Sequence, residues 1–461
     1  MSVSRFFGIL LIFFFLGAGV FFFRFDPAPF RPSIEHALAQ SLKVPVRIQK
    51  VTLEKKFPFD LIFEGLEFSE TGGNDFWFRA EQARAGIDFS AFVSWPLSLA
   101  FKKILLENSV LKIRRDPKGG WNFRMPPFAS NVPGISEAGP VLTFKQAKLD
   151  YQDASASPLF SMDFDFEGTA RSVPAGGMHF FFTARFRGRK ELPLMLLKAH
   201  YVPDPQAVSF ELKQAEGKWN LQGELHRILE GDNRFKLSIE TRSLDLAKTF
   251  PEYSTSREAI TGLMTAHLEG YGEGTHPHQI MRTLVMDGAI DLREGSFHHL
   301  NFLKEILAGL SPIPSFSNAV KSELRGAPGE FFQAEDLPFD MLRAGIHMAQ
   351  GNLAFQEGLI SQETAYIIEG EGNWALPEHS VDFNGKLVLF EEFSGALALQ
   401  AREWMPLRNE KGRILVPFKY RGLLPGASVY PDLNYVAAAT QLFQKEREAQ
   451  VLPKNEESQK S

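Results

Sequence analysis

The chain has 461 residues, a net charge of -5 at pH 7 and no cysteine. Without cysteine it can form no disulfide, no cysteine-ligated zinc site and no thiol nucleophile, and its slightly acidic balance gives no support for a nucleic-acid partner. Phenylalanine is in large excess, with 44 Phe against 8 Tyr. Because Phe carries no polar group, the chain must bury a large apolar surface against itself or against another molecule.

The first element is the segment Phe6–Phe23, which has no charged or strongly polar residue. As a helix it would extend about 27 Å, close to the ~30 Å hydrocarbon core of a bilayer. The alternative is a cleaved signal peptide, but the apolar core of a signal peptide usually has only about 7–15 residues. We therefore predict an uncleaved transmembrane helix and no second span. Arg5 precedes it and Arg24 and Arg31 follow it, so the positive-inside rule leaves its orientation open.

Three later segments have the spacing of short amphipathic helices. Residues 32–43 begin with a proline and repeat apolar residues at i, i+3 and i+4, and Pro45 ends the pattern. Residues 301–310 begin with Asn301, a preferred N-cap. Residues 434–447 repeat the pattern before a charged run, and we expect the last residues of the chain to be a disordered tail.

Between these helices, apolar and polar residues alternate with a period of two. This period is typical of antiparallel strands that have one apolar and one solvated face. It is clearest in Phe160–Glu167 and in Arg413–Tyr420, and turn sequences rich in Gly, Asp and Pro separate the runs. The residues predicted to line the apolar face in the middle of the chain are Phe160, Met162, Phe164, Phe166, Phe180, Phe182, Phe186, Phe210, Leu212, Trp219, Leu221, Phe235, Leu237 and Ile239.

The alternation predicts a mainly β protein but not how its sheet is arranged. The strands could close on themselves, stack as a sandwich or stay open as a trough. Roughly 25 strands side by side, at ~4.8 Å each, would form a ribbon about 120 Å long. Residues 126–140, which contain Pro, Gly and Ser, are predicted to be a loop or a domain boundary.

No arrangement of residues predicts catalysis. The chain has no G-x-S-x-G elbow, no H-E-x-x-H and no Walker loop. Gly270, Gly272 and Gly274 occur at every second position, and we predict a turn between strands there, with no helix after it, instead of a phosphate-binding loop.

Histidines and carboxylates give no stronger signal. His276, His278, His298 and His299 are the only histidine cluster, but Pro277 separates the first two and no carboxylate lies at short spacing, so we interpret them as loop residues and not as metal ligands. The pair Asp163 and Asp165 shares the solvent face of one predicted strand, and neither it nor Glu391–Glu392 predicts the unequal environments that acid–base catalysis needs. We expect no catalytic residue, no metal and no cofactor, and therefore not an enzyme.

The order of short motifs along the chain is more specific. After the apolar span and the first helix come Val46-Arg47-Ile48, a strand with Phe59, Leu61, Phe63 and Gly65-Leu66, then Ala80, Ala83, Ala85, Ile87-Asp88-Phe89, a strand with Ile104, Leu111 and Ile113, and the R-D-x-x-G-x-W-N sequence Arg115–Asn122. Near the carboxyl end come Leu244–Leu246, Thr261–Leu263, Gly270–Gly272, Asp287–Gly295, Gly351–Leu353, Glu369–Gly372 and Leu376. In this order the chain resembles the AsmA family of bacterial envelope proteins, including its TamB-like relatives, although residues 126–240 match only in their alternation.

The resemblance implies an organisation for the whole chain. It implies a cytoplasmic amino terminus (1–5), an inner-membrane helix (6–23), an AsmA-like amino-terminal β domain (24–125), a middle β-rich segment (126–240), an AsmA-like carboxyl-terminal β domain (241–433), and a final helix and tail (434–461). The body would then lie in the periplasm of a Gram-negative bacterium. Its fold would be a long, twisted, taco-like antiparallel β-groove with a few short amphipathic helices.

The resemblance also implies a function and leaves an alternative. The groove would carry phospholipid towards the outer membrane or otherwise support outer-membrane assembly, with the Phe-rich faces as its lining. In the alternative, the same faces pack on each other in a closed sandwich, and the protein is a scaffold that modulates outer-membrane protein biogenesis through contacts with outer-membrane or periplasmic assembly proteins. An envelope hydrolase has no supporting residues in the sequence.

Overall fold

The computed structural model describes residues 26–54, 60–69, 75–87, 101–117, 120–123, 141–154, 160–173, 177–187, 194–203, 206–227, 233–249, 260–274, 277–313, 316, 326–362, 364–424 and 426–451. The predicted membrane span 6–23, the predicted loop 126–140 and the tail after residue 451 lie outside these residues. Within the described part of the chain, no helix is both long and apolar enough to cross a membrane.

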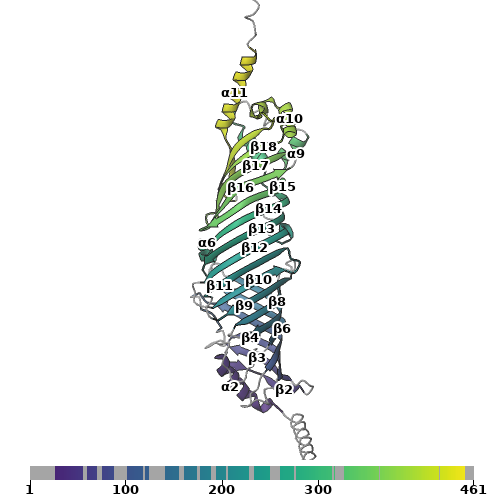
Figure 1. The fold of residues 1–461 in the computed structure, drawn as a ribbon, viewed down its shortest axis with the longest axis vertical. Helices are drawn as coiled ribbons and strands as arrows, with labels where there is room; N and C mark the ends of the chain where they lie inside the picture. Colours follow the sequence, from purple (N-terminus) through teal and green to yellow (C-terminus); the bar gives the residue numbers. More distant parts are fainter. Residues whose placement is uncertain are drawn as a thin grey trace, which may run out of the picture. The chain divides into compact units, whose positions relative to one another are not determined.

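The chain divides into two compact units. Unit 1 comprises Met1–Glu216, Gln222–Phe235 and Gly274–Pro277, and unit 2 comprises Gly217–Leu221, Lys236–Glu273 and His278–Ser461. Strands β11 (Trp219–His226) and β12 (Arg234–Asp245) therefore contribute residues to both units. The described residues are mainly β-strand, in curved antiparallel sheet with a few short helices, as the alternation predicted (Figure 1).

Unit 1 begins with helices and continues as strands in chain order. Its elements are η1 (Ala28–Phe30), α2 (Arg31–Leu42), β1 (Val46–Arg47), β2 (Lys50–Glu54), β3 (Asp60–Ser69), β4 (Phe76–Ile87), β5 (Phe101–Arg115), β6 (Val141–Asp153), β7 (Phe160–Ser172), β8 (Met178–Phe186), β9 (Met195–Val202) and β10 (Ala207–Gln214). Strand β3 pairs with β1 and β2. From β3 onward each strand pairs with the next, and the last of these pairs is β9 with β10. All these pairs are antiparallel except β5 with β6, which are parallel and so need a crossover between them.

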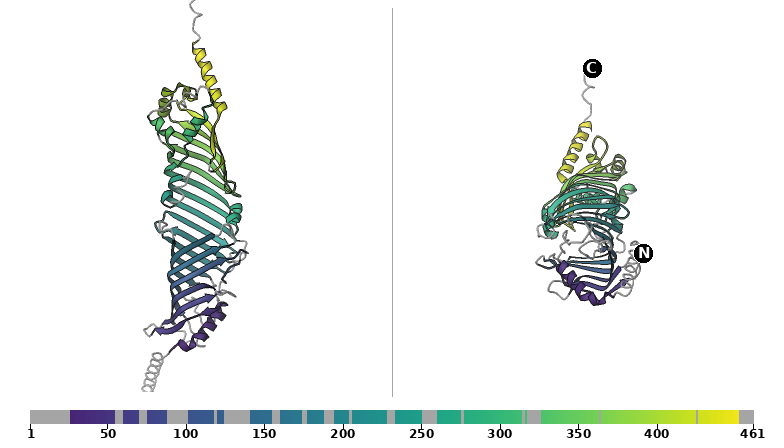
Figure 2. Two further views of the ribbon diagram at one scale, coloured as in Figure 1. Left: turned by 180° about the vertical axis from the view of Figure 1, so that it is seen from behind. Right: turned by 60° about the horizontal axis from the view of Figure 1, so that its bottom comes forward.

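In unit 2 the strands again follow one another in chain order, with several helices between them. Its elements are α4 (Leu246–Thr249), β13 (Ile260–Glu273), α6 (Pro277–Thr283, whose first residue belongs to unit 1), β14 (Val285–Phe297), α7 (Phe302–Gly309), α9 (Ala327–Gln333), β15 (Leu337–Ala349), β16 (Asn352–Gln362), β17 (Tyr366–Ala375), β18 (Ser380–Leu389), α10 (Glu391–Gln400), η2 (Arg402–Leu407), β19 (Leu415–Leu423), β20 (Ser428–Pro431) and α11 (Leu433–Val451). Strands β13 to β20 pair sequentially and antiparallel. Seen from two further directions, α11 projects beyond the strands of its unit (Figure 2).

β-Bulges interrupt the strand pairing in both units. The register shifts between Phe144 and Ala147 in β6 and between Phe355 and Gly358 in β16. At each shift one residue has a positive φ, 51° at Gln146 and 49° at Glu357. A bulge places an extra residue in one strand and increases the local twist, which favours a curved sheet over a flat one.

The helices predicted from the sequence are present with small shifts. Helix α2 ends at Leu42, because Lys43 takes the left-handed conformation with φ 54° before Pro45 is reached. Helix α7 begins after Asn301, whose Oδ1 accepts a hydrogen bond from the Lys304 N–H at 3.1 Å, as the N-cap prediction requires. Helix α11 covers the predicted segment 434–447 and extends to Val451.

The prediction for the glycines near residue 270 was wrong. Gly270 and Gly272 lie inside β13, where Gly270 pairs with Met286, and a short helix, α6, begins at Pro277. A Cβ at Gly270 would lie 2.7 Å from the Val285 carbonyl oxygen, so glycine allows the close approach of β14. Proline is favoured at the first position of a helix, and the prediction from the sequence did not take this into account at Pro277.

The buried residues form three clusters of different size. In unit 1, β2 to β5 and the apolar side of α2 enclose a cluster that includes Val51, Phe63 and Ala83. A small cluster, Ala170, Met178 and Tyr201, lies on β7 to β9. In unit 2, a much larger cluster joins β14 to β20 to the helices α7, α9, α10 and α11.

Candidate functional site

Strand β7 has the alternating exposure that its sequence predicts. Met162, Phe164 and Phe166 are half-buried, while Asp163 and Asp165 between them are exposed. Successive side chains on a strand point to opposite faces, so the apolar residues share one face and the acids share the other. The side chain of Phe160, the first residue of β7, lies outside the described part of the chain.

The strand register extends this face over five strands. Phe164 pairs with Phe186, Phe182 pairs with Leu197, and Leu212 pairs with Leu197 from the other side. Directly paired residues lie on the same face of a sheet. The apolar face of unit 1, as named here, consists of Leu142, Phe144, Ala147, Leu149, Met162, Phe164, Phe166, Ala170, Met178, Phe180, Phe182, Ala184, Phe186, Met195, Leu197, Ala199, Tyr201, Val208, Phe210 and Leu212.

Aromatic rings contact one another along this face. The ring centroids of Phe164 and Phe186 are 4.3 Å apart, and those of Phe166 and Phe182 are 5.2 Å apart in an edge-to-face arrangement. Phe144 lies 5.6 Å from Phe166 and 5.8 Å from Phe182. These distances are typical of favourable aromatic pairs. The rings therefore form a continuous apolar surface that crosses β6, β7 and β8.

This surface is only half-buried. Phe144, Phe164, Phe166, Phe182 and Phe210 are all intermediate in exposure. Five members of the apolar face, Ala147, Ala170, Met178, Met195 and Tyr201, are buried, and Ala170, Met178 and Tyr201 form a small cluster. A contiguous, partly exposed apolar surface on a folded protein marks a place where another apolar molecule can bind.

The opposite face of the same strands is polar. Asp165 forms an ion pair with Arg187 at 2.7 Å, and Glu211 forms ion pairs with Lys198 at 3.4 Å and Lys213 at 3.2 Å. One large apolar side chain, Phe181, is 51% exposed on this face. The sheet therefore has one wet face and one apolar face, and Phe181 provides an aromatic residue on the wet face for comparison.

Not all the residues predicted for the lining come together. Eight of them, from β7, β8 and β10, share the apolar face of unit 1: Met162, Phe164, Phe166, Phe180, Phe182, Phe186, Phe210 and Leu212. Trp219, Leu221, Leu237 and Ile239 are half-buried residues of unit 2, and Phe235, which is buried, belongs to unit 1. The predicted lining is thus divided between the two units.

The comparisons with known proteins identify no relative. No family model matches the chain, and no curated protein and no solved structure matches it. The resemblance to the AsmA family therefore rests on the sequence motifs alone.

The prediction missed lining residues on β6 and β9. Leu142, Phe144, Ala147 and Leu149 share the apolar face, but the bulge at Gln146 places Ala147 three positions after Phe144 and breaks the period of two. On β9, two adjacent leucines hide the alternation in the sequence. A sequence pattern that allows one extra residue at a polar position, as a β-bulge does, would include the apolar residues of β6.

A buried ion pair lies at the end of β5 and β6. Arg115 and Asp153 have side chains only 8% and 6% exposed, with Nη1 and Oδ2 3.8 Å apart. The Arg115 guanidinium carbon lies 5.3 Å from the centre of the Trp121 ring. The Tyr151 hydroxyl lies 3.5 Å from Asp153 Oδ2, and burial, reinforced by the Asp153 charge, raises the pKa of Tyr151.

The R-D-x-x-G-x-W-N sequence forms a hairpin around this pair. Arg115 and Trp121 form an isolated antiparallel bridge, and the Gly120 N–H donates to Asp116 Oδ1 at 2.8 Å. Asn122 accepts from the Arg114 N–H at 2.8 Å and donates to the Lys112 carbonyl at 2.9 Å. The motif is accounted for by these structural contacts.

His298 and His299 of the predicted histidine cluster lie beside a carboxylate from a later part of the chain. Among the described residues, no three His, Asp or Glu side chains are grouped so that they could hold a metal ion. His298 Nδ1 lies 3.0 Å from Asp336 Oδ2, and the backbone N–H of His299 donates to Asp336 Oδ1 at 2.9 Å. The sequence reading missed Asp336, because it lies 37 residues further along the chain. His278 falls in α6, and His276 lies outside the described residues.

The two pairs of carboxylates considered from the sequence lie on a strand and in a helix. Asp163 and Asp165 are exposed on the wet face of β7, as predicted. Glu391 and Glu392 lie in the first turn of α10, where negative charge interacts favourably with the helix dipole. Neither carboxylate pair lies on the apolar face of unit 1.

Proposed function

We propose that this protein binds phospholipid acyl chains on the apolar face of unit 1. The observation that carries the proposal is that this face is continuous, rich in Phe and only half-buried. Each methylene group removed from water contributes about 0.8 kcal/mol, so ten methylenes on such a surface contribute about 8 kcal/mol before the cost of ordering the chain. The opposite face carries ion pairs and suits contact with water.

The cellular role follows from the family resemblance. We place the protein in the inner membrane, held by the span 6–23, with its amino terminus in the cytoplasm and its body in the periplasm. There it supports outer-membrane assembly as an AsmA-like protein by carrying phospholipid in a β-groove. It acts by binding and not as an enzyme, and it uses no cofactor.

One observation favours a second candidate function. Beyond Val436, which is fully buried, α11 exposes most of its residues, including Leu442 at 61%. Exposed apolar residues on a projecting helix are suited to a protein contact. In this alternative the protein is a scaffold that binds a periplasmic or outer-membrane assembly protein, and its apolar faces serve only stability.

Site-specific photocrosslinking in cells tests the lipid proposal. The photoreactive residue p-benzoyl-phenylalanine is placed in the full chain at Phe164, Phe182 or Phe181, and the adducts are analysed by mass spectrometry. The first two positions lie on the apolar face and the third is its matched control on the wet face. We expect phospholipid adducts at Phe164 and Phe182 and none at Phe181. Equal labelling at all three positions, or none at Phe164 and Phe182, contradicts the proposal.

A further inference from the structure

The segment between β14 and β15 folds back onto the apolar side of unit 2. Phe297, the last residue of β14, pairs directly with Leu337, the first residue of β15, so the chain leaves and re-enters the sheet at one place. The described parts of this excursion contain α7 and α9. Because β14 and β15 pair directly at this point, the excursion is not needed to bring them together, and its helices have another role in the unit.

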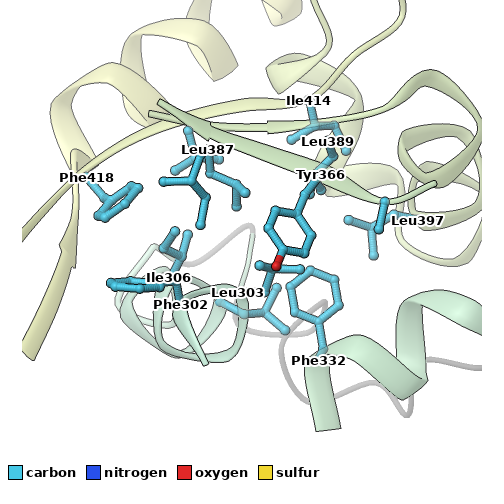
Figure 3. Packing of buried hydrophobic residues seen from close by; sticks show 14 of the residues in the cluster. Phe302, Leu303, Ile306, Phe332, Tyr366, Leu387, Leu389, Leu397, Ile414 and Phe418 are labelled. Atoms are coloured by element: carbon cyan, nitrogen blue, oxygen red, sulfur yellow. The ribbon is translucent and has the colours of Figure 1, made fainter. Parts of the chain in front are cut away.

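Helix α7 fills the space over the last strands. Leu303 and Ile306 are 0% and 2% exposed, and they belong to one buried cluster with Leu387 of β18 and Val416 of β19, at 2% and 1%. Figure 3 shows the side chains of α7 facing those of Tyr366, Leu387 and Phe418. Phe302 lies 5.8 Å from Phe418 and 5.4 Å from Tyr420, measured between ring centroids. This part of the sheet face is solidly packed.

Strands β15, β16 and β17 carry a further row of apolar side chains on this face. Met348, Leu353 and Trp374 pair across these strands; Met348 is buried, and Leu353 and Trp374 are half-buried. Phe355 is also half-buried, and none of these residues belongs to the large cluster. Along β17, Trp374 lies six positions, roughly 20 Å, from Ile368 of that cluster. Val381, which pairs with Trp374 on β18, marks the border, because it packs against the cluster. One sheet face thus changes from solid core to half-buried apolar surface along its strands.

Hydrogen bonds fasten the base of α7. Asp336, next to β15, binds His298 and the backbone N–H of His299, just before α7. Asn301 Nδ2 donates to the carbonyl oxygens of Phe331 at 2.7 Å and Ala334 at 2.9 Å, both at the end of α9. The two helices are therefore tied to each other and to the sheet at the point where the excursion begins and ends.

We propose that α7 is an end wall that stops acyl chains on the apolar face of unit 2, which consists of Met348, Leu353, Phe355 and Trp374. This inference rests on the proposed function and adds to it the limit of the binding surface. An acyl chain on this face does not reach Leu387 or Val416, which lie in one buried cluster with Leu303 and Ile306 of α7. Lipid enters and leaves unit 2 by the half-buried side of these strands and not past the helices.

Single cysteines test the wall, because the chain has none of its own. Phe355→Cys reports on the half-buried side, and Val416→Cys, nearly the same size as the residue it replaces, reports on the covered side. The full chain is held in amphipol and treated with N-ethylmaleimide, with and without diheptanoylphosphatidylcholine. We expect Phe355→Cys to react and to be slowed about tenfold by the lipid, and Val416→Cys to react at least about tenfold more slowly in either condition, because thiol reactivity needs exposure.

A second set of variants separates a wall from ordinary burial. Leu387→Cys, opposite Val416 in the register, repeats the measurement at another covered position. Adding Asn301→Ala and Asp336→Ala to Val416→Cys removes the fastening of α7 and is expected to raise both its reactivity and its protection by lipid. Lipid that slows Val416→Cys and Leu387→Cys as much as Phe355→Cys, with the fastening intact, overturns the wall alone. Lipid that fails to protect Phe355→Cys, together with an absence of adducts at Phe164, counts against the proposed function instead.

Discussion

Phe164 of β7 and Phe186 of β8 stand directly opposite each other with their rings 4.3 Å apart, and neither is fully buried. In a closed sandwich, residues at the centre of such a pair would be covered by a second layer of side chains, as Leu303 and Ile306 cover Leu387 in unit 2. In the proposed function, an apolar ligand supplies the contacts that this pair lacks. The proposal depends on this difference between the pair in unit 1 and the covered part of unit 2.

The variant Phe164→Asp with Phe182→Asp distinguishes a binding face from a closed core. Each half-buried Phe loses about 1–2 kcal/mol of apolar burial, which a half-wet surface tolerates better than a solid core does. We expect the double variant to stay folded by circular dichroism and to lose its bound phospholipid. Phe181→Asp changes a residue on the wet face of β8, the strand that also carries Phe182, and is expected to keep both the fold and the lipid. Loss of all folded protein in the double variant alone would favour the closed sandwich.

The strand pattern could be predicted from the sequence, because exposure follows the alternation closely. Ile414, Val416, Phe418 and Tyr420 are all buried, and the residues between them are not. The capped helix after Asn301 could also be predicted, because a cap is a local interaction. In both cases the structure depends on neighbours in the sequence.

The contacts that the sequence did not predict are those between distant residues. The alternation around Phe164 does not reveal that α7 packs over part of the face of unit 2, nor that the apolar face of unit 1 is half-buried. The link between His298 and Asp336 is equally invisible, because it forms only when β14 and β15 pair. Within a strand, the bulge at Gln146 shifts the phase of β6 and conceals Phe144. Long-range packing and bulges are not encoded in a short periodic pattern.

The buried pair of Arg115 and Asp153 makes a prediction for stability. Removing one partner leaves an uncompensated buried charge, so Asp153→Asn or Arg115→Met alone is expected to cost about 3–5 kcal/mol. Replacing both, by Arg115→Met with Asp153→Leu, is expected to restore most of that loss. Urea denaturation of the three variants and the parent chain measures the difference. If the double variant is as unstable as the sum of the two single ones, the pair itself is not the origin of the loss.

The side chain of Asn301 has two functions that substitution can separate. Its Oδ1 caps α7, and its Nδ2 donates to two carbonyl groups near the end of α9. Asn301→Asp keeps the cap and loses both donated bonds, whereas Asn301→Ala loses everything, including a cap that contributes about 1 kcal/mol. We expect amide exchange in α7 to increase in the order parent, Asn301→Asp, Asn301→Ala. Identical exchange in the parent chain and Asn301→Asp would show that the bonds to α9 do not hold the helix.

Asp336 links the stability of the α7 base to pH. The backbone N–H of His299, and after it His298, hold the pKa of Asp336 below its usual value, and burial opposes them only in part. Since the folded pKa is depressed, the stabilisation is complete above the usual carboxyl pKa of about 3.9 and is lost as the pH falls through the lower folded value. We expect the parent chain to be more stable than Asp336→Asn at pH 7 and the difference to shrink as the pH falls below about 4. Urea midpoints of the two proteins between pH 7 and pH 3 measure it, and Asp163→Asn, at an exposed position on the wet face of β7, is the control for general acid effects. A difference that stays constant down to pH 3 would mean that the charge of Asp336 does not fasten the helix.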